Sequence, residues 1–369
     1  MKTKRTNLDE LFMMECIALA RKGAGYVSPN PMVGAVIVKD GKVVGRGYHK
    51  RFGGPHAEVE AIRNAKSSVS GATIYINLEP CNYYGKTPPC SDLIIKNKMA
   101  KVVIGSRDPN PLVSGKGISQ LRKSGIEVIE GPLRDECRKL NEAFSKYITK
   151  NLPFVALKIA QSLDGKISQA TKAQRWITNQ ASRGLVHLLR SHYDAVLVGA
   201  GTVLKDNPRL TVRNVQGRNP IRVVIDGNLR TDTDANVFSP TETKTILFTS
   251  NKSSKACRMK ELALLEKGIE VIKLKTQPDE IIPLKDILRE LAHRGVASLL
   301  VEGGAKIFSS FIEQKIADKL YVFIGPKIFG KGLNAFEYLT ARNAKHIQLK
   351  DISVINIDDD LLIEAYVNK

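Results

Sequence analysis

Apolar and polar positions in the N-terminal part of the chain follow the rhythms of alternating strands and helices. The segment VGAVIVKDGKVVGRGYH (33–49) reads as two strands on either side of an Asp-Gly pair, which predicts a β-hairpin. A helix is predicted to follow at 56–66. Further strands are predicted at 72–78, 101–106 and 126–131, with one helix after Cys90 and another that ends at Gly125. This interleaving over about 145 residues is typical of a complete α/β domain.

A second alternation of strands and helices follows Pro153. The helix predicted over 135–151 has to end before this proline, because the ring cannot continue a helical pattern. Beyond it we predict strands at 154–160, 195–199, 221–226, 245–249, 269–273, 298–301 and 319–325, and helices at 178–192, 257–267, 284–294 and 304–314. A chain of 369 residues also exceeds one ordinary core, so we predict two domains, 1–148 and 149–369.

The N-terminal segment predicts an amphipathic helix rather than a targeting or membrane segment. One apolar face would consist of Leu8, Leu11, Phe12, Cys16 and Leu19. Acidic residues interrupt any apolar signal core, and no apolar run approaches the roughly 20 residues that span a bilayer. We therefore expect a cytoplasmic protein without a membrane partner.

Composition and charge narrow the function classes only slightly. Hydrophobic residues make up 43% and charged residues 25% of the chain, which is typical of a globular protein. Lys and Arg number 57 against 37 Asp and Glu, a net charge of +20 that can indicate nucleic-acid binding. The basic residues are spread along the chain without a long block, which favours a solvated basic surface. We therefore expect no nucleic-acid partner.

Four residues of the first predicted domain suggest metal chemistry. Zinc prefers nitrogen and sulfur ligands, and a catalytic zinc keeps three protein ligands and one open position. His56, Cys81 and Cys90 supply such a set. Glu58 is too close to His56 in sequence to be a convenient fourth ligand, but it could face a zinc-bound water and carry its protons. The order H-x-E, then P-C and a further cysteine, is the pattern of the zinc nucleobase deaminases.

The setting of the cysteines sharpens this interpretation. His56 and Cys90 each follow proline at a predicted helix start, where the helix dipole favours negative charge and thus a thiolate. The chain has five cysteines, an odd and sparse set that is not typical of a disulfide framework. Eight residues separate Cys81 from Cys90, whereas the general deaminase signature has two. The longer loop argues against an ordinary cytidine or tRNA-adenosine deaminase.

Three segments, NPMVGAVIVKDG (30–41), HAEVEA (56–61) and EPCNYYGKTPPC (79–90), resemble the bifunctional riboflavin biosynthesis deaminase/reductase family. The resemblance covers essentially the whole chain. It implies an α/β protein with an N-terminal cytidine-deaminase-like three-layer α/β/α domain and a C-terminal dihydrofolate-reductase-like α/β domain. It further implies zinc on His56, Cys81 and Cys90 and a proton-carrying Glu58. The implied pyrimidine and ribose-phosphate contacts are Asn30, His49, Lys86 and Asp108.

One position departs from the family pattern. The family usually has a histidine where this chain has Tyr83. Tyrosine can donate a hydrogen bond and stack, but it carries no positive charge near neutral pH. A role of that histidine toward a phosphate is therefore not carried over to Tyr83.

The second predicted domain carries the same resemblance in KIAQSLDGKIS (158–168), RWITN (175–179), VGAGTVLKDNPRLTVR (198–213) and VEGGAKIFSSF (301–311). Glycines after an apolar strand let backbone amides approach a phosphate. Neither VGAGT nor VEGG is a Rossmann or Walker motif, and close glycine packing is the alternative. The resemblance implies NADPH contacts at Ala160, Trp176, Thr202, Asp206, Gly304, Ala305 and Lys306, and substrate contacts at Lys158, Arg190, Leu210, Arg213 and Glu302.

Two of these substrate contacts suit a phosphate on chemical grounds. The guanidinium forks of Arg190 and Arg213 match phosphate oxygens, although a surface charge is the alternative for Arg190. For Trp176, the single tryptophan of the chain, the alternative is core filling.

The resemblance implies an enzyme with two activities. The first domain would deaminate 2,5-diamino-6-(ribosylamino)-4(3H)-pyrimidinone 5'-phosphate by hydrolysis. The second would reduce the ribosyl group of 5-amino-6-(5-phosphoribosylamino)uracil to ribityl with NADPH. Phosphorylated pyrimidines are then the partners, and the reductase-like fold suggests a homodimer or homotetramer by analogy.

Two alternatives stay open at this point. The net charge of +20 motivates a nucleic-acid, tRNA-editing deaminase with an appended non-catalytic domain. The Tyr83 change motivates a chain in which one domain is inactive and serves as a scaffold.

Overall fold

The computed structural model describes residues 8–83, 88–169, 176–240, 243–251, 255–276, 282–340 and 346–368. The chain forms two compact units, Met1–Asn151 and Leu152–Lys369. Each unit has its own sheet and its own apolar core. Among the described residues, no helix combines the length and apolar character needed to cross a membrane.

The first unit is built on a five-stranded sheet with the order β2-β1-β3-β4-β5. Its strands are β1 (Gly34–Lys39), β2 (Lys42–Tyr48), β3 (Thr73–Leu78), β4 (Lys101–Ser106) and β5 (Glu127–Glu130). β2 and β3 pair antiparallel with β1, whereas β4 and β5 continue parallel to β3. The predicted hairpin is confirmed, and Asp40 and Gly41 have the positive φ values, 49° and 72°, that suit its tight turn.

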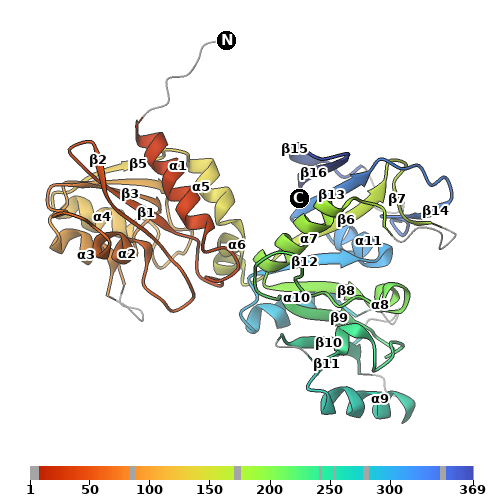
Figure 1. Ribbon diagram of the computed structural model, residues 1–369. Helices are drawn as coiled ribbons and strands as arrows, with labels where there is room; N and C mark the ends of the chain where they lie inside the picture. Colours follow the sequence, from red (N-terminus) through yellow and green to blue (C-terminus); the bar gives the residue numbers. More distant parts are fainter. Residues whose placement is uncertain are drawn as a thin grey trace. The chain divides into compact units, whose positions relative to one another are not determined.

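Helices cover both faces of this sheet and complete three layers (Figure 1). On one face lie α1 (Leu8–Arg21) and α5 (Arg134–Leu140), and on the other lie α2 (Ala57–Arg63), α3 (Cys90–Lys96) and α4 (Lys116–Lys123). Each face carries its own apolar cluster. This explains why β1 reads as a continuous apolar run, since a strand covered on both faces needs apolar side chains on both.

The single helix predicted over 135–151 is wrong: the chain forms α5 and then α6 (Glu142–Lys150), which meet at Asn141. Asn141 is 5% exposed. Its side-chain amide accepts a hydrogen bond from Met32 N (2.8 Å) and donates one to Met32 O (3.0 Å). Met32 lies 109 positions earlier in the chain. The apolar pattern could not show this break, because its cause is a contact with a distant segment.

The N-terminal helix is confirmed, but its predicted apolar face is partly wrong. The buried stripe consists of Met13, Cys16, Ile17 and Ala20. This is the i, i+3, i+4, i+7 spacing of one helix face. The side chains of Leu8 and Leu11 are instead 67% and 45% exposed.

The second unit is built on a nine-stranded sheet with the order β11-β10-β9-β8-β12-β6-β13-β16-β15. The parallel strands are β6 (Phe154–Ser162), β8 (Ala195–Gly199), β9 (Ile221–Ile225), β10 (Thr245–Ser250), β11 (Glu270–Leu274), β12 (Ser298–Gly303) and β13 (Lys319–Gly325). Two antiparallel strands, β16 (Asp360–Val367) and β15 (Leu349–Ile357), extend one edge.

Helices again cover both faces of the sheet (Figure 1). On one face α10 (Leu284–His293) and α11 (Ala305–Glu313) pack into the largest apolar cluster. The other face carries α7 (Gln180–His192), α8 (Ala200–Asp206), α9 (Lys255–Glu266) and the short 3-10 turn η1 (Asn236–Phe238).

The seven strands and four helices predicted for this unit are confirmed, but six elements among the described residues were not predicted. These are α8, η1, β15, β16 and the two-stranded ribbon of β7 (Lys166–Gln169) and β14 (Gly332–Asn334). β15 is exposed at seven consecutive positions, so its sequence has no buried face to reveal it.

Candidate active sites

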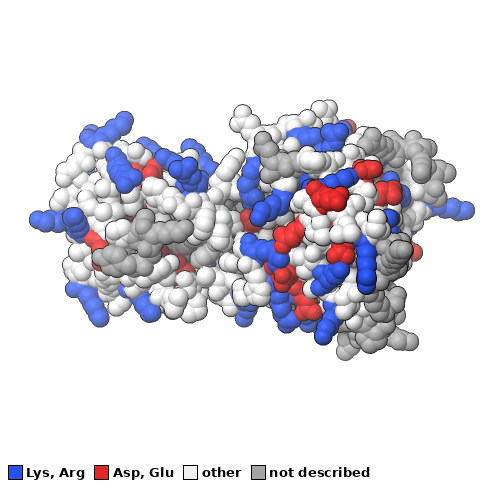
Figure 2. Space-filling model, turned by 90° about the horizontal axis from the view of Figure 1, so that it is seen from below, with Lys and Arg blue, Asp and Glu red and all other residues white. Residues whose placement is uncertain are grey.

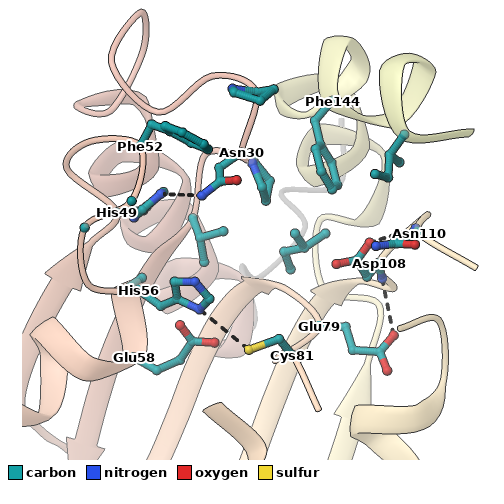
Figure 3. Close-up of a pocket in the computed structure, with 18 of the residues that line it drawn as sticks. Asn30, His49, Phe52, His56, Glu58, Glu79, Cys81, Asp108, Asn110 and Phe144 are labelled. Atoms are coloured by element: carbon teal, nitrogen blue, oxygen red, sulfur yellow. Dashed lines mark hydrogen bonds between the residues drawn. The ribbon is translucent and has the colours of Figure 1, made fainter. Parts of the chain in front are cut away.

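A pocket of about 330 Å³ opens in the first unit above the predicted zinc ligands (Figure 3). His56, Glu58 and Cys81 lie along its floor. Its walls come from the loop before β1, the connection from β2 to α2, the loop after β4, and α6. Segments from most of the unit therefore converge on one cavity.

Three donor atoms meet at the floor of this pocket. His56 Nδ1 lies 3.3 Å from Cys90 Sγ and 3.6 Å from Cys81 Sγ, and the three donor atoms are within 4.8 Å of one another. Tetrahedral zinc, with bonds of about 2.0 Å to nitrogen and 2.3 Å to sulfur, separates such ligands by about 3.5 Å. One imidazole and two thiols at these distances fit a catalytic zinc, with a fourth position left for water.

The local fold delivers each ligand from the end of an element. His56 is the residue before α2, Cys90 is the first residue of α3, and Cys81 lies in the loop that follows β3. Cys90 N donates to Cys81 Sγ at 3.4 Å, and Ser91 N donates to Cys81 O at 3.1 Å. The start of α3 thus holds the Cys81 loop against the metal position.

The three ligands polarise one another. The hydrogen bond with Cys81 raises the pKa of the His56 imidazole to about 9. The hydrogen bond with Cys90 lowers the pKa of the Cys81 thiol to about 4, and the same contact raises the pKa of Cys90. Cys81 is therefore held as a thiolate, the form that binds metal.

Glu58 lies in the first turn of α2 and is 3% exposed. Burial raises the pKa of its carboxyl group above the ordinary value, although the neighbouring His56 charge lowers it. Its carboxyl group lies beside His56 on the pocket floor (Figure 3). A raised pKa makes the carboxylate a better proton acceptor, which suits general acid/base chemistry.

His49 and Asn30, which the resemblance implies as substrate contacts, lie on one wall and bond to each other. Asn30 Nδ2 is 3.1 Å from His49 Nε2, and His49 Nδ1 is 2.9 Å from Pro55 O. His49 is 2% exposed, and burial lowers the pKa of its imidazole. The ring is therefore neutral at physiological pH.

Asp108 lies on the opposite wall and is 7% exposed (Figure 3). Burial raises the pKa of its carboxyl group to about 6. Its loop is held by Glu79, a buried carboxylate that accepts from Asp108 N (3.3 Å), Gly115 N (3.0 Å) and Ile118 N (3.2 Å). Sequence reasoning missed Glu79, which acts on the backbone of distant residues.

The apolar upper wall of the pocket was also missed. It consists of Phe52, Phe144, Tyr147 and Ile148. Phe52 and Phe144 lie on either side of the pocket, away from the metal ligands (Figure 3). Positions 144, 147 and 148 have the spacing of one helix face, so an apolar stripe on the predicted helix was the available signal.

Two of the residues singled out from the sequence, Tyr83 and Lys86, fall between Cys81 and Cys90. Tyr83 lines the pocket and is 50% exposed. Lys86, which the resemblance implies as a substrate contact, lies outside the described residues.

In the second unit, three predicted substrate contacts form one buried charge cluster. Glu302, at 6% side-chain exposure, bonds Arg190 Nε (2.5 Å) and Nη2 (2.9 Å) and lies 3.2 Å from Lys158 Nζ. Lys158 and Arg190 are 13% and 12% exposed. Burial raises the pKa of the Glu302 carboxyl group, but the charges of Arg190 and Lys158 outweigh this effect and bring that pKa down to about 2. Arg190 is therefore not a solvated surface charge but the partner of a buried carboxylate.

Arg213 and Leu210 lie on the segment after α8. Arg213 is exposed, its Nη1 donates to Thr211 Oγ1 (3.0 Å), and its backbone N donates to His187 Nδ1 (3.2 Å). Leu210 is 2% exposed and packs into an apolar cluster with a positive φ of 56°. Of the two, the Arg213 side chain is the one accessible to a ligand.

Two of the predicted NADPH contacts, Thr202 and Gly304, lie side by side just after β8 and β12. A Cβ on Gly303 or Gly304 would lie 3.4 or 3.3 Å from Thr202 Oγ1, so a side chain there would fill the space beside this hydroxyl. Such a cradle of bare backbone fits a dinucleotide phosphate. Gly199 differs, because its Cβ would come within 2.9 Å of Ile307, so packing explains that glycine.

The remaining predicted NADPH contacts come from several elements. Ala160 lies on β6, Asp206 ends α8, and Ala305 and Lys306 begin α11. Trp176 is 51% exposed, and the Arg183 guanidinium lies 4.8 Å from the centre of its ring. The alternative of core filling is therefore wrong for Trp176.

The basic surface shows no concentrated footprint on the face in view. Figure 2 shows Lys and Arg side chains spread over that face of each unit, with acidic side chains among them in the second unit. Exposed pairs such as Arg107 with Glu130 and Arg294 with Glu270 neutralise part of the charge.

Comparison with known proteins gives a family for each half of the chain. Residues 6–106 match the cytidine and deoxycytidylate deaminase zinc-binding region, and residues 153–363 match the RibD C-terminal domain. The riboflavin biosynthesis protein RibD of Aquifex aeolicus is 43% identical over 96% of this chain and 98% of its own length. That of Actinobacillus pleuropneumoniae is 40% identical over 98% and 96%.

Solved structures agree over the full length. A diaminohydroxyphosphoribosylaminopyrimidine deaminase/5-amino-6-(5-phosphoribosylamino)uracil reductase from Thermotoga maritima is 44% identical, with a TM-score of 0.85, over 98% of this chain and 99% of that one. Acinetobacter baumannii RibD is 34% identical, with a TM-score of 0.86 over the same shares. These relatives do not favour the nucleic-acid deaminase alternative. Their full-length likeness, together with the zinc-ligand set of the first unit, shows that the chain belongs to the RibD family of riboflavin biosynthesis proteins.

Proposed function

We propose that the first unit, Met1–Asn151, removes an amino group by hydrolysis from 2,5-diamino-6-(ribosylamino)-4(3H)-pyrimidinone 5'-phosphate. The observation that carries this proposal is the convergence of His56, Cys81 and Cys90 beside a buried Glu58 at the floor of a pocket. The name of the Thermotoga maritima relative, a diaminohydroxyphosphoribosylaminopyrimidine deaminase, supports the choice of substrate.

The pocket residues have distinct tasks in this reaction. Zinc on His56, Cys81 and Cys90 would lower the pKa of a water and so make a nucleophile available near neutral pH. Glu58 takes the proton that the attacking water loses and delivers it to the departing amino group. One water is consumed and one ammonia released. The apolar wall keeps bulk water away from the reacting carbon.

Ammonia release tests the role of Glu58. Glu58→Gln is expected to lower the deamination rate about 10²- to 10⁴-fold, because the amide cannot carry a proton. Zinc content should stay at that of the unsubstituted protein. Glu60→Gln is the matched control, because Glu60 lies two residues along the same helix and outside the pocket lining. An undiminished rate in Glu58→Gln would overturn the proposal.

We also propose that the second unit, Leu152–Lys369, reduces the ribosyl group of 5-amino-6-(5-phosphoribosylamino)uracil to ribityl with NADPH. The bare backbone of Gly303 and Gly304 beside Thr202, with exposed Trp176, supports a dinucleotide site. Bound NADPH would supply the hydride. Lys158, held by Glu302 at 3.2 Å, is the candidate for delivering the accompanying proton. Arg213 suits the substrate phosphate, because it is exposed and lies near enough to Arg190 for the two charges to interact.

NADPH oxidation with the deaminated substrate tests this second site. Arg213→Ala is expected to raise KM about ten- to hundred-fold, because a charge-assisted phosphate contact is lost. The control is Arg289→Ala, which removes an arginine with 64% exposure that pairs with Asp286. An Arg213→Ala enzyme with an unchanged KM would show that the phosphate binds elsewhere.

We propose further that the protein is a homodimer or homotetramer. The edge strand β15 supports this, because Ile352, Val354 and Ile355 are 60%, 59% and 44% exposed. Exposed apolar edge strands invite pairing with another strand unless they are protected.

We place the protein in the cytoplasm. All five cysteines are free thiols, and the two proposed zinc ligands among them must stay reduced to bind metal.

A further inference from the structure

His49 makes two hydrogen bonds that together define its protonation. Its ring lies between β2 and α2 and is 2% exposed. Nδ1 faces Pro55 O at 2.9 Å, and Nε2 faces the side-chain amide of Asn30 at 3.1 Å. Both ring nitrogens are therefore occupied by protein groups.

The chemistry of these partners fixes the direction of each bond. A backbone carbonyl can only accept, so Nδ1 must carry the proton that binds Pro55 O. The NH₂ group of Asn30 faces Nε2 and can only donate, so Nε2 is the acceptor of that bond. The two contacts together describe a ring whose one proton lies on Nδ1.

The bond to His49 also fixes which atom of the Asn30 amide faces the pocket. With the NH₂ group turned toward His49, the carbonyl oxygen Oδ1 points into the pocket (Figure 3). Turning the amide over would set Oδ1 against the lone pair of Nε2, where neither atom has a proton to share. That arrangement leaves two buried acceptors unsatisfied, so the observed orientation is strongly favoured.

Hydrogen bonds also hold the backbone around Asn30 in place. The orientation of the side-chain amide therefore decides which atom faces the pocket. Asn30 N donates to Val27 O at 2.9 Å. Two residues on, Met32 O accepts from Asn77 Nδ2 and Asn141 Nδ2, both at 3.0 Å. The segment therefore cannot shift to offer the pocket a different atom.

We propose that His49 is a positioning residue, which orients Asn30 so that a carbonyl oxygen, and not an NH₂ group, faces the substrate. Asn30 then selects a ring or amino N–H of the pyrimidinone and rejects an acceptor at that place. This inference rests on the proposed deamination. It also changes the role that the resemblance implies for His49, because a ring whose two nitrogens are both occupied has no hydrogen bond left for the substrate and acts through Asn30.

A double-mutant cycle on the full-length protein tests the proposal. The variants are Asn30→Ala, His49→Phe, the double variant, and His49→Gln, which keeps an acceptor for Asn30. Asn97→Ala is the matched control, since its amide also bonds a backbone carbonyl, Leu93 O at 2.8 Å, but lies outside the pocket lining. The readouts are kcat and KM for ammonia release, zinc content, and reductase activity of the same sample as a check on folding.

We expect each single variant to raise KM about ten- to hundred-fold with kcat changed less than threefold, because a binding contact is lost without loss of the proton carrier. Removing His49 in the Asn30→Ala background should change KM less than threefold further, and His49→Gln should recover most of the loss. Additive effects in the double variant would overturn the proposal, since His49 would then act independently of Asn30. A loss of zinc in His49→Phe with zinc retained in Asn30→Ala would overturn it as well.

A second measurement is independent of turnover. Long-range ¹H–¹⁵N NMR of protein labelled at its six histidines reports the tautomer of each ring, and His49→Phe identifies the His49 signals. The Nδ1–H tautomer is expected, and an Nε2–H tautomer or a charged ring would refute the proposal. If the unsubstituted protein shows the expected tautomer but releases no ammonia, the proposed deamination fails while the orientation of Asn30 stands.

Discussion

Replacing Glu302 by glutamine tests the buried charge cluster of the second unit. Glutamine keeps the shape of the side chain but removes the negative charge, so Arg190 and Lys158 face a neutral amide. These two side chains are 12% and 13% exposed, so water cannot solvate the charges that Glu302 leaves unpaired. Breaking a buried ion pair on one side is costly for this reason.

The expected loss can be worked out from the electrostatics of Glu302. Burial raises the pKa of this carboxyl group, yet Arg190 and Lys158 bring it from the ordinary value of 4.5 down to about 2. At about 1.4 kcal/mol for each pH unit, this lowering corresponds to about 3 kcal/mol in favour of the paired carboxylate. Removing one partner of a buried pair generally costs about 3–5 kcal/mol. We therefore expect Glu302→Gln to lower the free energy of unfolding of the second unit by about 3–5 kcal/mol.

The stabilisation by the Glu302 carboxylate should also depend on pH. The pKa is lower in the folded than in the unfolded state, so the stabilisation is fully present above about pH 4.5 and is lost as the pH falls toward 2. The difference between the unsubstituted protein and Glu302→Gln should shrink over the same interval.

Urea unfolding at pH 7 and at pH 3 is a suitable assay. Trp176 is the single tryptophan of the chain and lies in the second unit, so its fluorescence reports the unfolding of that unit. Glu270→Gln is the control, because its pair with Arg294 at 2.6 Å is 42% and 29% exposed and should contribute less than about 1 kcal/mol. The triple variant K158M/R190L/E302L removes all three charges and should regain most of the stability. A loss below about 1 kcal/mol at pH 7, or an equal loss at both pH values, would refute the reasoning.

Three further predictions concern the metal, the support of the pocket and the assembly. Removing zinc with a chelator should abolish ammonia release and leave NADPH-dependent reduction unchanged, which parallel assays on one sample can measure; equal loss of both activities would contradict separate sites. Asn141→Ala should lower the free energy of unfolding of the first unit by about 1–3 kcal/mol, because Met32 N loses its acceptor in a partly buried place; thermal denaturation followed by loss of deaminase activity checks it. Val354→Lys should shift the protein to a smaller assembly in light scattering, since it places a charge on the exposed edge of β15, and an unchanged mass would rule out that edge as the interface.

The zinc-ligand candidates could be identified from the sequence because their signal is local. His56 and Glu58 start one helix, and Cys81 and Cys90 bracket one loop, so order and spacing alone indicated the chemistry. Most strands and most helices followed for the same reason, because each of them buries a continuous apolar stripe. The break at Asn141 and the pairing of Arg190 with Glu302 could not be predicted, since the partners are 109 and 112 residues apart. Periodicity cannot encode such contacts.

Three buried polar residues that the sequence did not reveal share one physical task. Glu79 bonds the backbone of the Asp108 loop, Asn141 and Asn77 bond the backbone of Met32, and each is at most 5% exposed. None of the three takes part in the reaction, but the side chain of each holds a loop that carries a pocket residue. Substituting any of them should therefore weaken substrate binding and lower the free energy of unfolding together. Without its hydrogen bonds the loop is less stable, and the pocket residue that it carries is misplaced. Substitution of Glu58 should lower only the deamination rate, since its carboxyl group takes part in the reaction and does not hold a loop in place. This difference separates the groups that perform the chemistry from those that hold them in place.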